Sequence, residues 1–264
     1  MKVFVISLPD SGERRRSAQQ QLDRAGVPFE FFDAIRGDIA IRDCIFEGFD
    51  ETSYLLNTGR HAVIGEIGCF ASHRELWRHC VELNEPLVIL EDDFNVLPRF
   101  KNALRAAANI IDTVGFVRLQ TTLRAKQAKI AKVSGFQLGR FVKAPHGMMC
   151  YCLSPKVARH FLEETRIIHA PVDVFMKKYW EHGQPLYALT PFTIAPSVLS
   201  VETTIEDRNK GRKSFRTAQR RFRRKANWYL RRWIFNLRMR FQRSPVGDKP
   251  VNRSDLQEPV SSSR

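Results

Sequence analysis

The first 34 residues of the chain have the pattern of a strand, a helix and a second strand, and this order restricts the fold strongly. The uninterrupted apolar run at 3–8 is closed by Pro9, which is the pattern of a strand buried on both faces. A helix is predicted at 14–25, and a second strand follows at 28–34. Such a strand–helix–strand unit favours a parallel sheet with crossover helices.

Further elements follow from the same patterns. A helix is predicted at 64–83, and residues 86–90 form the most clearly buried strand of the sequence. Residues 36–62, which have several glycines and mixed polarity, are interpreted as a loop. The other predicted elements are helices at 98–111, 154–162 and 171–180 and strands at 115–119, 141–142, 148–153 and 186–189. This succession predicts an α/β domain with a mixed, mainly parallel sheet flanked by helices.

Three acidic residues follow the buried strand at 86–90 without a break. Glu91, Asp92 and Asp93 would repel one another, and burial would raise the pKa values of their carboxyl groups. A divalent cation such as Mn²⁺ or Mg²⁺ removes this conflict, because carboxylate oxygens are natural ligands for hard ions. In an extended triplet the first and third side chains point the same way, so Glu91 and Asp93 can face one ion while Asp92 points elsewhere. Open α/β sheets bind their ligands at this end of the strands.

Two plainer interpretations of these polar residues stay open. The triplet can be a solvated acidic turn that caps the next helix. The five cysteines form no CxxC pair and, in a reducing compartment, are explained most simply as small buried hydrophobic side chains. A zinc site formed by Cys69, His73 and Cys80 is the sharper alternative, although it lacks a second closely spaced ligand pair.

The positive charge of the chain is concentrated in one segment. Of the 43 Lys and Arg residues, 15 lie between Arg208 and Arg243, where there is no Asp or Glu. The rest of the chain therefore has 28 basic side chains against 28 acidic ones. The formal net charge of +15 is a property of this segment, so it does not mark the main body as a nucleic-acid-binding fold.

Within this basic segment, apolar side chains recur at intervals of three and four residues. A helix with arginines on one side and aromatic residues on the other is typical of an interfacial membrane anchor. The alternatives are that the apolar face packs on the main domain, or that the arginines bind nucleic acid. The apolar positions are Phe222, Ala226, Tyr229, Leu230, Trp233, Leu237 and Phe241.

Several separate segments resemble those of the family 25 glycosyltransferases, which include the β-1,4-galactosyltransferases of bacterial lipooligosaccharide synthesis. The segments occur in the family's order over residues 3–205, and their ordered set is specific although each is short. They are Val5-Ile6-Ser7-Leu8 with Glu13-Arg14-Arg15, Phe29 to Ala34, Gly65-Glu66, Cys69-Phe70 with Ser72-His73, Leu76-Trp77, Leu90 to Asp93, Phe116 to Leu119 with Thr121, Gly147 with Tyr151, and Val172-Asp173.

The resemblance implies a GT-A-like, Rossmann-type fold, a UDP-sugar donor (often UDP-galactose), a divalent metal and transfer with inversion. The triplet matches the family's variant of the DXD motif. Glu91 and Asp93 would then hold the metal and the diphosphate, and Asp92 would lie near the donor ribose or sugar. The ion neutralises the charge that develops on the departing nucleoside diphosphate. The acceptor of the resembled enzymes is a lipid-linked saccharide.

Other matching residues are candidates for contacts with the donor. They are Ser7, Leu8, Arg14, Asp33, Ser72, His73 and Arg118. The first four lie at or just after the carboxyl ends of the first two predicted strands, where the uracil and ribose are expected. His73 can equally be a satisfied core residue of its helix, and Arg118 can be an ion-pair partner of the triplet.

Inversion requires a base on the acceptor side, and Asp173 is the candidate for it, with Glu66 in reserve. Asp173 can also serve simply as the N-cap of the helix that begins there. The family usually has small residues between the glycine and the tyrosine of its fourth block, whereas this chain has Met148, Met149 and Cys150. If these side chains line the sugar pocket, they alter which hexose is accepted.

The sequence thus predicts a catalytic domain at 1–206, a basic membrane-association helix at 207–243 and a disordered tail at 244–264. The expected activity is metal-dependent transfer of a hexose, galactose first, from a UDP-sugar to a lipid-linked oligosaccharide in lipooligosaccharide or lipopolysaccharide biosynthesis. The alternatives are a metal-dependent hydrolase or nucleotidyltransferase, and a non-catalytic basic module that binds membranes or nucleic acid. No nucleic-acid partner is expected. Without a membrane-spanning run or a secretory signal, we expect a cytoplasmic protein at the inner face of the cytoplasmic membrane.

Overall fold

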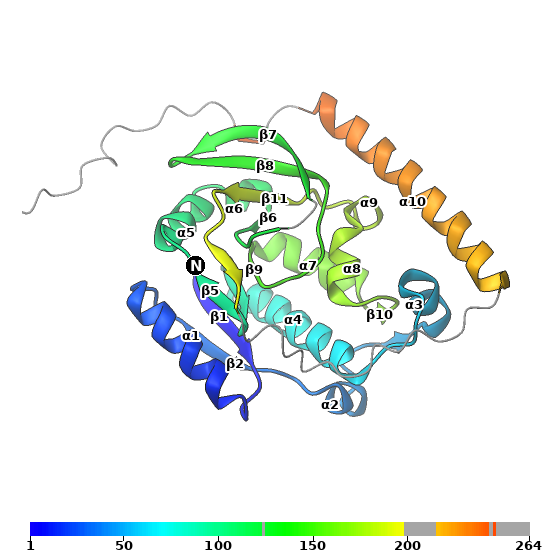
Figure 1. Ribbon diagram of the computed structural model, residues 1–264, viewed down its shortest axis with the longest axis horizontal. Coiled ribbons are helices and arrows are strands. Elements are labelled where there is room, and N and C mark those ends of the chain that lie inside the picture. Colours follow the sequence, from blue (N-terminus) through cyan, green and yellow to red (C-terminus); the bar gives the residue numbers. More distant parts are fainter. Residues whose placement is uncertain (123–124, 198–214, 243–244, 247–264) are drawn as a thin grey trace, which may run out of the picture.

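A computed structural model describes residues 1–122, 125–197, 215–242 and 245–246 (Figure 1). Its centre is an eight-stranded sheet in the order β2-β1-β4-β9-β6-β11-β8-β7. These strands are β1 (Lys2–Ser7), β2 (Glu30–Asp33), β4 (Leu87–Glu91), β6 (Phe116–Arg118), β7 (Lys126–Val133), β8 (Phe136–Lys143), β9 (Cys150–Leu153) and β11 (Tyr187–Thr190). Two small sheets pair β3 (Gly48–Phe49) with β10 (Ile167–Ile168), and β5 (Phe94–Val96) with β12 (Ile194–Pro196).

The large sheet combines parallel and antiparallel pairs. β1 runs parallel to both β2 and β4, and β11 runs parallel to β6. β9 is antiparallel to both β4 and β6, and β8 is antiparallel to both β7 and β11. The predicted α/β class and the strand–helix–strand opening are confirmed. The sheet is more evenly mixed than a mainly parallel one, because β9 and the hairpin of β7 and β8 enter it antiparallel.

Helices cover both faces of this sheet. α1 (Gly12–Arg24), α5 (Phe100–Ala108) and α6 (Ile111–Val114) pack on the face to which Val3 and Val5 point. α4 (Ile64–Leu83), α7 (Pro155–Glu164), α8 (Val172–Lys177) and α9 (Tyr179–His182) pack on the face to which Phe4 and Ile6 point. Successive residues of β1 therefore enter two different hydrophobic cores, which explains why the strand is apolar at consecutive positions.

The segment 36–62 is not the loop that was predicted. It contains α2 (Gly37–Arg42), β3 and α3 (Glu51–Thr58). The side chain of Asp50 caps α3 by accepting a hydrogen bond of 2.8 Å from the Ser53 N–H. Gly37 lets α2 approach α4 closely, because a Cβ atom there would lie 2.0 Å from the Ile64 carbonyl oxygen. This glycine marks close helix packing rather than irregular chain.

Three further elements differ from the prediction. The strand predicted at 141–142 is the end of β8, which pairs with β7, a strand that was not predicted. The turn between these two strands is formed by Ser134 and Gly135, whose φ angles are 46° and 77°. The helix predicted at 98–111 is divided into α5 and α6, and the one at 171–180 is divided at Lys178 into α8 and α9. By contrast, the helix predicted at 64–83 is α4, with the same bounds.

The basic segment forms a 27-residue helix, α10 (Phe215–Phe241), as predicted. It lies against α3 and α9 at the edge of the domain (Figure 1). The domain boundary predicted near 206, and all of the tail predicted at 244–264 except residues 245–246, lie outside the described residues. Within the described ranges, no helix combines the length and the apolar character that crossing a bilayer requires.

Candidate active site

The carboxyl ends of three neighbouring strands bring the acidic triplet together with other predicted residues. β1 lies between β2 and β4, and its register places Ser7 beside Asp33 and Ile6 beside Glu91. Glu91 is the last residue of β4, and the other two acids follow it. Polar side chains that are far apart in sequence therefore meet at one edge of the sheet, which is where open α/β proteins bind ligands.

Asp92 is held by two of the predicted donor-binding residues. Its carboxylate accepts a hydrogen bond of 2.6 Å from Ser7 Oγ and lies 3.3 Å from Nη1 of Arg14. Ser7 is buried, whereas Arg14 and Asp92 are half-buried. Asp92 therefore points toward β1 and α1, away from the side of Glu91 that contacts α4.

Arg15 is not among the predicted site residues, yet it ties the ends of β1 and β2 together. Its guanidinium donates to the carbonyl oxygens of Ser7 and Leu8 at 3.0 and 3.1 Å and forms an ion pair with Asp33. The same group lies 4.8 Å from the centre of the Phe31 ring. Leu8 and Asp33 thus help to shape this corner through Arg15. The only signal for it in the sequence is a run of arginines just after a strand.

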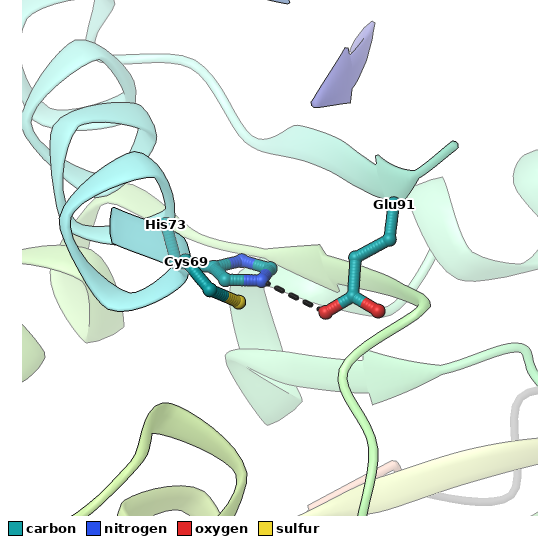
Figure 2. A group of neighbouring side chains, drawn as sticks. All are labelled: Cys69, His73 and Glu91. Carbon is teal, nitrogen blue, oxygen red and sulfur yellow. Dashed lines mark hydrogen bonds and ion pairs between the residues drawn. The ribbon is translucent and has the colours of Figure 1, made fainter. Parts of the chain in front are cut away.

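A chain of hydrogen bonds fixes the position of Glu91. The indole N–H of Trp77 donates to the Tyr151 hydroxyl at 2.8 Å, and this hydroxyl lies 2.9 Å from Nδ1 of His73. Nε2 of His73 lies 3.1 Å from Oε1 of Glu91 (Figure 2). Because an indole only donates and a carboxylate only accepts, the neutral imidazole accepts at Nδ1 and donates from Nε2. His73 is fully buried, so it acts on a ligand through Glu91 rather than by direct contact.

Cys69, His73 and Glu91 offer ligand atoms that all lie within 4.8 Å of one another (Figure 2). Cys80, which belongs to the predicted zinc set, is directed elsewhere, with its Sγ 3.2 Å from the Glu85 carbonyl oxygen. Burial and the charge of Glu91 raise the pKa of the Cys69 thiol well above its usual range. Because Cys80 is directed away, the structure does not bring together the predicted zinc set of Cys69, His73 and Cys80.

Asp93 lies in an unfavourable electrostatic environment. Its Oδ1 atom is buried and has no hydrogen-bond partner among the described residues. Burial, together with the charges of Glu91 and Asp92, raises the pKa of Asp93 to about 7. A buried oxygen without a partner and a carboxylate whose ionisation is disfavoured both indicate that a positive group belongs beside them.

Glu91 and Asp93 are suited to hold a divalent cation. Both supply hard carboxylate oxygens, and the Glu91 side chain is 28% exposed, so a ligand can reach it from solvent. Mn²⁺ and Mg²⁺ bind such oxygens and keep water or phosphate oxygens at their other positions. These oxygens are of the kind that the predicted cation binds, and the cation itself stays a prediction.

Arg118, at the end of β6, is 1% exposed. Its Nη1 donates to the His146 carbonyl oxygen at 3.3 Å, and its Nε has no partner in the described part of the chain. Burial lowers the pKa of Arg118 to about 10, and the negative charges of Asp173 and Glu91 oppose this shift. The arginine that forms an ion pair with the triplet is Arg14, not Arg118. A buried guanidinium with an unused N–H, close to an acidic site, is a candidate anion-binding group.

Asp173 lies in the first turn of α8 and is not its N-cap, a position that Pro171 occupies. Its Oδ2 lies 2.9 Å from Nδ1 of His146, and Nε2 of that ring lies 2.7 Å from Nζ of Lys177. Burial raises the pKa of Asp173, but the hydrogen bond and charge of His146 and the Gly147 N–H outweigh it, so the pKa is lowered. With its side chain 30% exposed, Asp173 is an ionised carboxylate that a ligand can reach.

Two other predicted residues have partners that explain them structurally. Glu66 is buried, forms an ion pair with Arg60 and accepts a hydrogen bond of 2.7 Å from the Tyr54 hydroxyl. Ser72 is buried, accepts from the Ile35 N–H and donates to a carbonyl one turn earlier in α4, both at 2.8 Å. We attribute both residues to the packing of α4. This geometry gives no support to a donor contact of Ser72 or to Glu66 as the base.

The fourth block of the family pattern is buried rather than open. Met148, Met149 and Cys150 are all in the core. Met148 lies against the buried arginine, with its Sδ atom 3.5 Å from Nη2 of Arg118. These larger side chains therefore do not line an open pocket. Met148 affects the site indirectly, through its contact with Arg118.

Three more residues of the site are not among the predicted ones. Trp77 and Tyr151 occur in the family-like segments, but no pattern in the linear sequence shows that their side chains meet beside His73. His146 lies 27 positions before Asp173, in a stretch without a recognisable motif. Tertiary contacts, which the spacing along the chain does not reveal, bring Trp77 and Tyr151 to His73, and His146 to Asp173.

Comparison with known proteins defines the class of this molecule as a glycosyltransferase. The family model described as "Glycosyltransferase family 25 (LPS biosynthesis protein)" matches residues 1–176, which is more than half of the chain. The chain belongs to glycosyltransferase family 25.

Individual relatives agree with this assignment. The chain is 25% identical over 209 residues to the lacto-N-neotetraose biosynthesis glycosyltransferase LgtE of Neisseria gonorrhoeae, a match that covers 72% of each chain. It is 26% identical over 201 residues to the lipooligosaccharide biosynthesis protein lic2B of Haemophilus influenzae, covering 71% of this chain and 73% of that protein. A glycosyltransferase 25 family member of Aedes aegypti is 33% identical over 118 residues, and this match spans 42% of the chain but 18% of the insect protein.

Proposed function

We propose that the protein is an inverting, divalent-metal-dependent hexosyltransferase with a GT-A-like fold. It moves a hexose, galactose first, from a UDP-sugar to a lipid-linked oligosaccharide in lipooligosaccharide or lipopolysaccharide biosynthesis. The similarity to LgtE and lic2B supports the substrate class, and the carboxylate cluster at the sheet edge supports the use of a metal. The basic helix α10 supports action at the inner, anionic face of the cytoplasmic membrane.

Glu91 and Asp93 would hold Mn²⁺ or Mg²⁺ against the donor diphosphate. When bound, the cation supplies positive charge that stabilises the leaving nucleoside diphosphate. His73 keeps the Glu91 carboxylate in one orientation by donating to Oε1. The Oδ1 atom of Asp93, which has no partner among the described residues, would supply the second ligand.

The other polar groups of the sheet edge bind the donor. Asp92, oriented by Ser7 and Arg14, borders the ribose or the sugar. Arg118 presents a buried positive charge for the diphosphate, because its Nε is unused in the described structure and the acidic groups around it are not in direct contact. Asp33 closes the nucleoside end of the site, where it pairs with Arg15.

Asp173 is the base that takes the proton from the acceptor hydroxyl. As this proton leaves, the acceptor oxygen forms a bond to the anomeric carbon and the bond from that carbon to the diphosphate oxygen breaks, which inverts the configuration. Asp173 is suited to this role because it is ionised and 30% exposed. His146 fixes its orientation through a hydrogen bond of 2.9 Å. Glu66 is less suited, because Arg60 and Tyr54 engage its carboxylate.

One observation carries the proposal: a buried carboxylate oxygen of Asp93 lacks a partner within the described structure and lies beside two more acids. The test is to screen UDP-hexoses for Mn²⁺-dependent transfer to simple galactoside, glucoside and N-acetylglucosaminide acceptors, with and without a chelator. We expect transfer in Mn²⁺, none in chelator and none with Asp93→Asn. Asp112→Asn, at an exposed position of α6, is the matched control and should keep full activity.

Each alternative function predicts a different result. Full turnover in chelator, or with Asp93→Asn, would contradict the metal role. Donor breakdown that is independent of any acceptor sugar would indicate a hydrolase or a nucleotidyltransferase. A non-catalytic module would show no thermal stabilisation by a UDP-sugar together with Mn²⁺, whereas the proposed enzyme is stabilised because both bind the folded state.

A further inference from the structure

Helix α10 is attached to the domain by one of its faces. Trp228, Arg232, Phe235 and Met239 recur at intervals of three and four residues, and each is partly buried. Trp228 and Phe235 pack against the core under α8 and α9, and the Phe235 ring lies 5.2 Å from the ring of Tyr179 in an edge-on arrangement. This stripe is the docked face of α10.

Polar contacts lock the docked face in place. Asn236 Nδ2 donates to the Val142 carbonyl oxygen at 3.0 Å, and the Tyr179 hydroxyl donates to the same oxygen at 2.8 Å. Nη1 of Arg140 donates to the Met239 carbonyl oxygen at 2.8 Å. Such specific bonds hold the helix in one rotation about its axis, so its opposite face is also fixed relative to the domain.

The opposite face of α10 carries large apolar side chains that are exposed. Phe222 is 74% exposed, Tyr229 and Trp233 are each 62% exposed, and Phe241 is 84% exposed. Leu230 and Leu237 extend the same stripe. These are the apolar positions predicted to form the membrane-binding side. The alternative that they pack on the main domain is wrong, because the helix docks through the other face.

Basic side chains flank the exposed stripe. Arg223, Lys225, Arg238 and Arg240 are all exposed, and α10 contains no acidic residue. Aromatic rings beside cations match the interface of an anionic bilayer, where the rings enter the headgroup region and the cations meet phosphates. Nucleic acid fits this face less well, because Leu230 and Leu237 have no ring on which a base can stack.

We propose that the exposed face of α10 lies on an anionic lipid surface and that the docked face holds the catalytic domain on that surface in one orientation. α10 contacts α3 and α9, and α9 follows directly on α8, which carries Asp173 (Figure 1). The base would therefore lie on the membrane side of the domain, where an acceptor saccharide anchored in the bilayer is presented. This last step rests on the proposed transferase function, whereas the lipid contact itself does not.

Flotation of the full chain with vesicles tests the lipid contact. The vesicles are phosphatidylcholine with or without about one third phosphatidylglycerol, since each basic residue gains roughly 1 kcal/mol only beside anionic lipid. We expect Tyr229→Ser/Trp233→Ser to weaken binding to the anionic vesicles at least about ten-fold, because two large apolar side chains are lost. Asn227→Ser, at an exposed position beside the stripe, is the control and should bind like the parent. Parent-like binding of the double variant would overturn the proposal.

Tryptophan quenching by brominated lipid tests which face meets the bilayer. Trp233 is on the exposed face and Trp228 is on the docked face, so the two residues form a matched pair. Trp233→Phe should lose most of the quenching seen in the parent, and Trp228→Phe should retain it. Equal losses in the two variants, or a larger loss with Trp228→Phe, would show that the orientation is wrong. Binding to single-stranded RNA but not to vesicles would also overturn the proposal.

Activity assays separate this inference from the proposed function. The Tyr229→Ser/Trp233→Ser variant should transfer sugar to a soluble acceptor at the parental rate and to a vesicle-embedded acceptor at least about ten-fold more slowly. Equal rates on the two acceptors would contradict the orienting role of α10. If no variant and no parent transfers sugar to either acceptor, the transferase proposal fails, while flotation and quenching still decide whether α10 binds lipid.

Discussion

The Nε2 atom of His73 donates to Oε1 of Glu91 across 3.1 Å, and this bond joins the middle of α4 to the end of β4. The Tyr151 hydroxyl accepts a hydrogen bond from the Trp77 N–H and donates one to Nδ1 of His73. His73 is fully buried, so water does not contact its ring. The carboxylate that we assign to the metal is thus oriented by hydrogen bonds from buried side chains. Such supporting hydrogen bonds are usual behind the ligands of a metal site.

The first prediction concerns Tyr151→Phe, which removes the hydroxyl in the middle of this chain of bonds. The His73 ring then loses the partner that sets its tautomer, so we expect the affinity for Mn²⁺ and kcat/KM each to fall about 10- to 100-fold. The Trp77 N–H is left unpaired, which should cost about 1–3 kcal/mol in the free energy of unfolding. Titration of transfer activity with Mn²⁺, and urea denaturation, measure the two effects.

Tyr179→Phe is the control for this loss. It also removes a buried hydroxyl, one that bonds to the Val142 carbonyl oxygen at 2.8 Å and to Asn236 at 3.2 Å but is not part of the His73 chain. A similar loss of stability with unchanged Mn²⁺ affinity is expected. Equal shifts of the Mn²⁺ affinity in both variants would mean that the Tyr151 hydroxyl contributes to stability only.

The second prediction is that Asp93→Asn stabilises the metal-free protein while it abolishes transfer. The pKa of Asp93 is raised to about 7 in the folded state, against roughly 3.9 in an unfolded chain. The folded state therefore binds this proton more tightly, and ionisation of Asp93 lowers stability as the pH rises from about 4 to 7. The amide should raise the free energy of unfolding by ~1–3 kcal/mol more at pH 8 than at pH 5, measured by urea denaturation in chelator. The same gain at both pH values would contradict the electrostatic explanation.

Much of the sheet edge follows from patterns that act over a few residues. The apolar runs before Ser7 and Glu91 identify β1 and β4, and their parallel order brings Ser7, Asp33 and the triplet together. The helix at 64–83 was equally clear, because its apolar positions persist over 20 residues. In these elements local propensity and burial favour the same structure.

Other features depend on contacts that a linear pattern does not contain. α2 and α3 have only six and eight residues, and Gly37 in α2 resembles a loop signal until its close packing against α4 is seen. The support for Glu91 requires β9 to lie antiparallel beside β4, a register that pairs Tyr151 with Ile89. The sequence allows Arg118 to be an ion-pair partner of the triplet, but in the described chain its Nη1 donates to the His146 carbonyl oxygen and its Nη2 contacts the Met148 sulfur.

The third prediction concerns acid stability and the buried residue His182. Burial lowers the pKa of His182 to about 3, and its two nitrogens contact the Met176 carbonyl oxygen and the Gln184 N–H, each at 3.3 Å. A histidine of the unfolded chain binds a proton near pH 6.5, so the unfolded state gains protons first as the pH falls. His182 should then contribute a loss of about 1.4 kcal/mol per pH unit between pH 6.5 and 3.

Chemical denaturation at pH 7.5, 6.5, 5.5 and 5 checks this contribution. His182→Gln should make the fall in the free energy of unfolding with decreasing pH shallower by about the same amount per unit. An unchanged slope in His182→Gln would show that the imidazole takes up a proton without unfolding.

The last prediction separates the two candidate bases. Asp173→Asn keeps the size of the side chain but cannot accept the acceptor proton, so kcat should fall about 10²- to 10⁴-fold while donor binding and stability change little. Because the pKa of Asp173 is lowered, the parent enzyme should not lose this base until the pH falls below the ordinary carboxyl range.

Glu66→Gln should behave in the opposite way. It weakens a buried ion pair with Arg60, so stability should fall by about 3 kcal/mol while kcat of the folded enzyme is kept. Calorimetric donor titration, thermal unfolding and kcat for both variants decide between the roles. A large loss of kcat in Glu66→Gln together with near-normal turnover in Asp173→Asn would show that Glu66, and not Asp173, is the base.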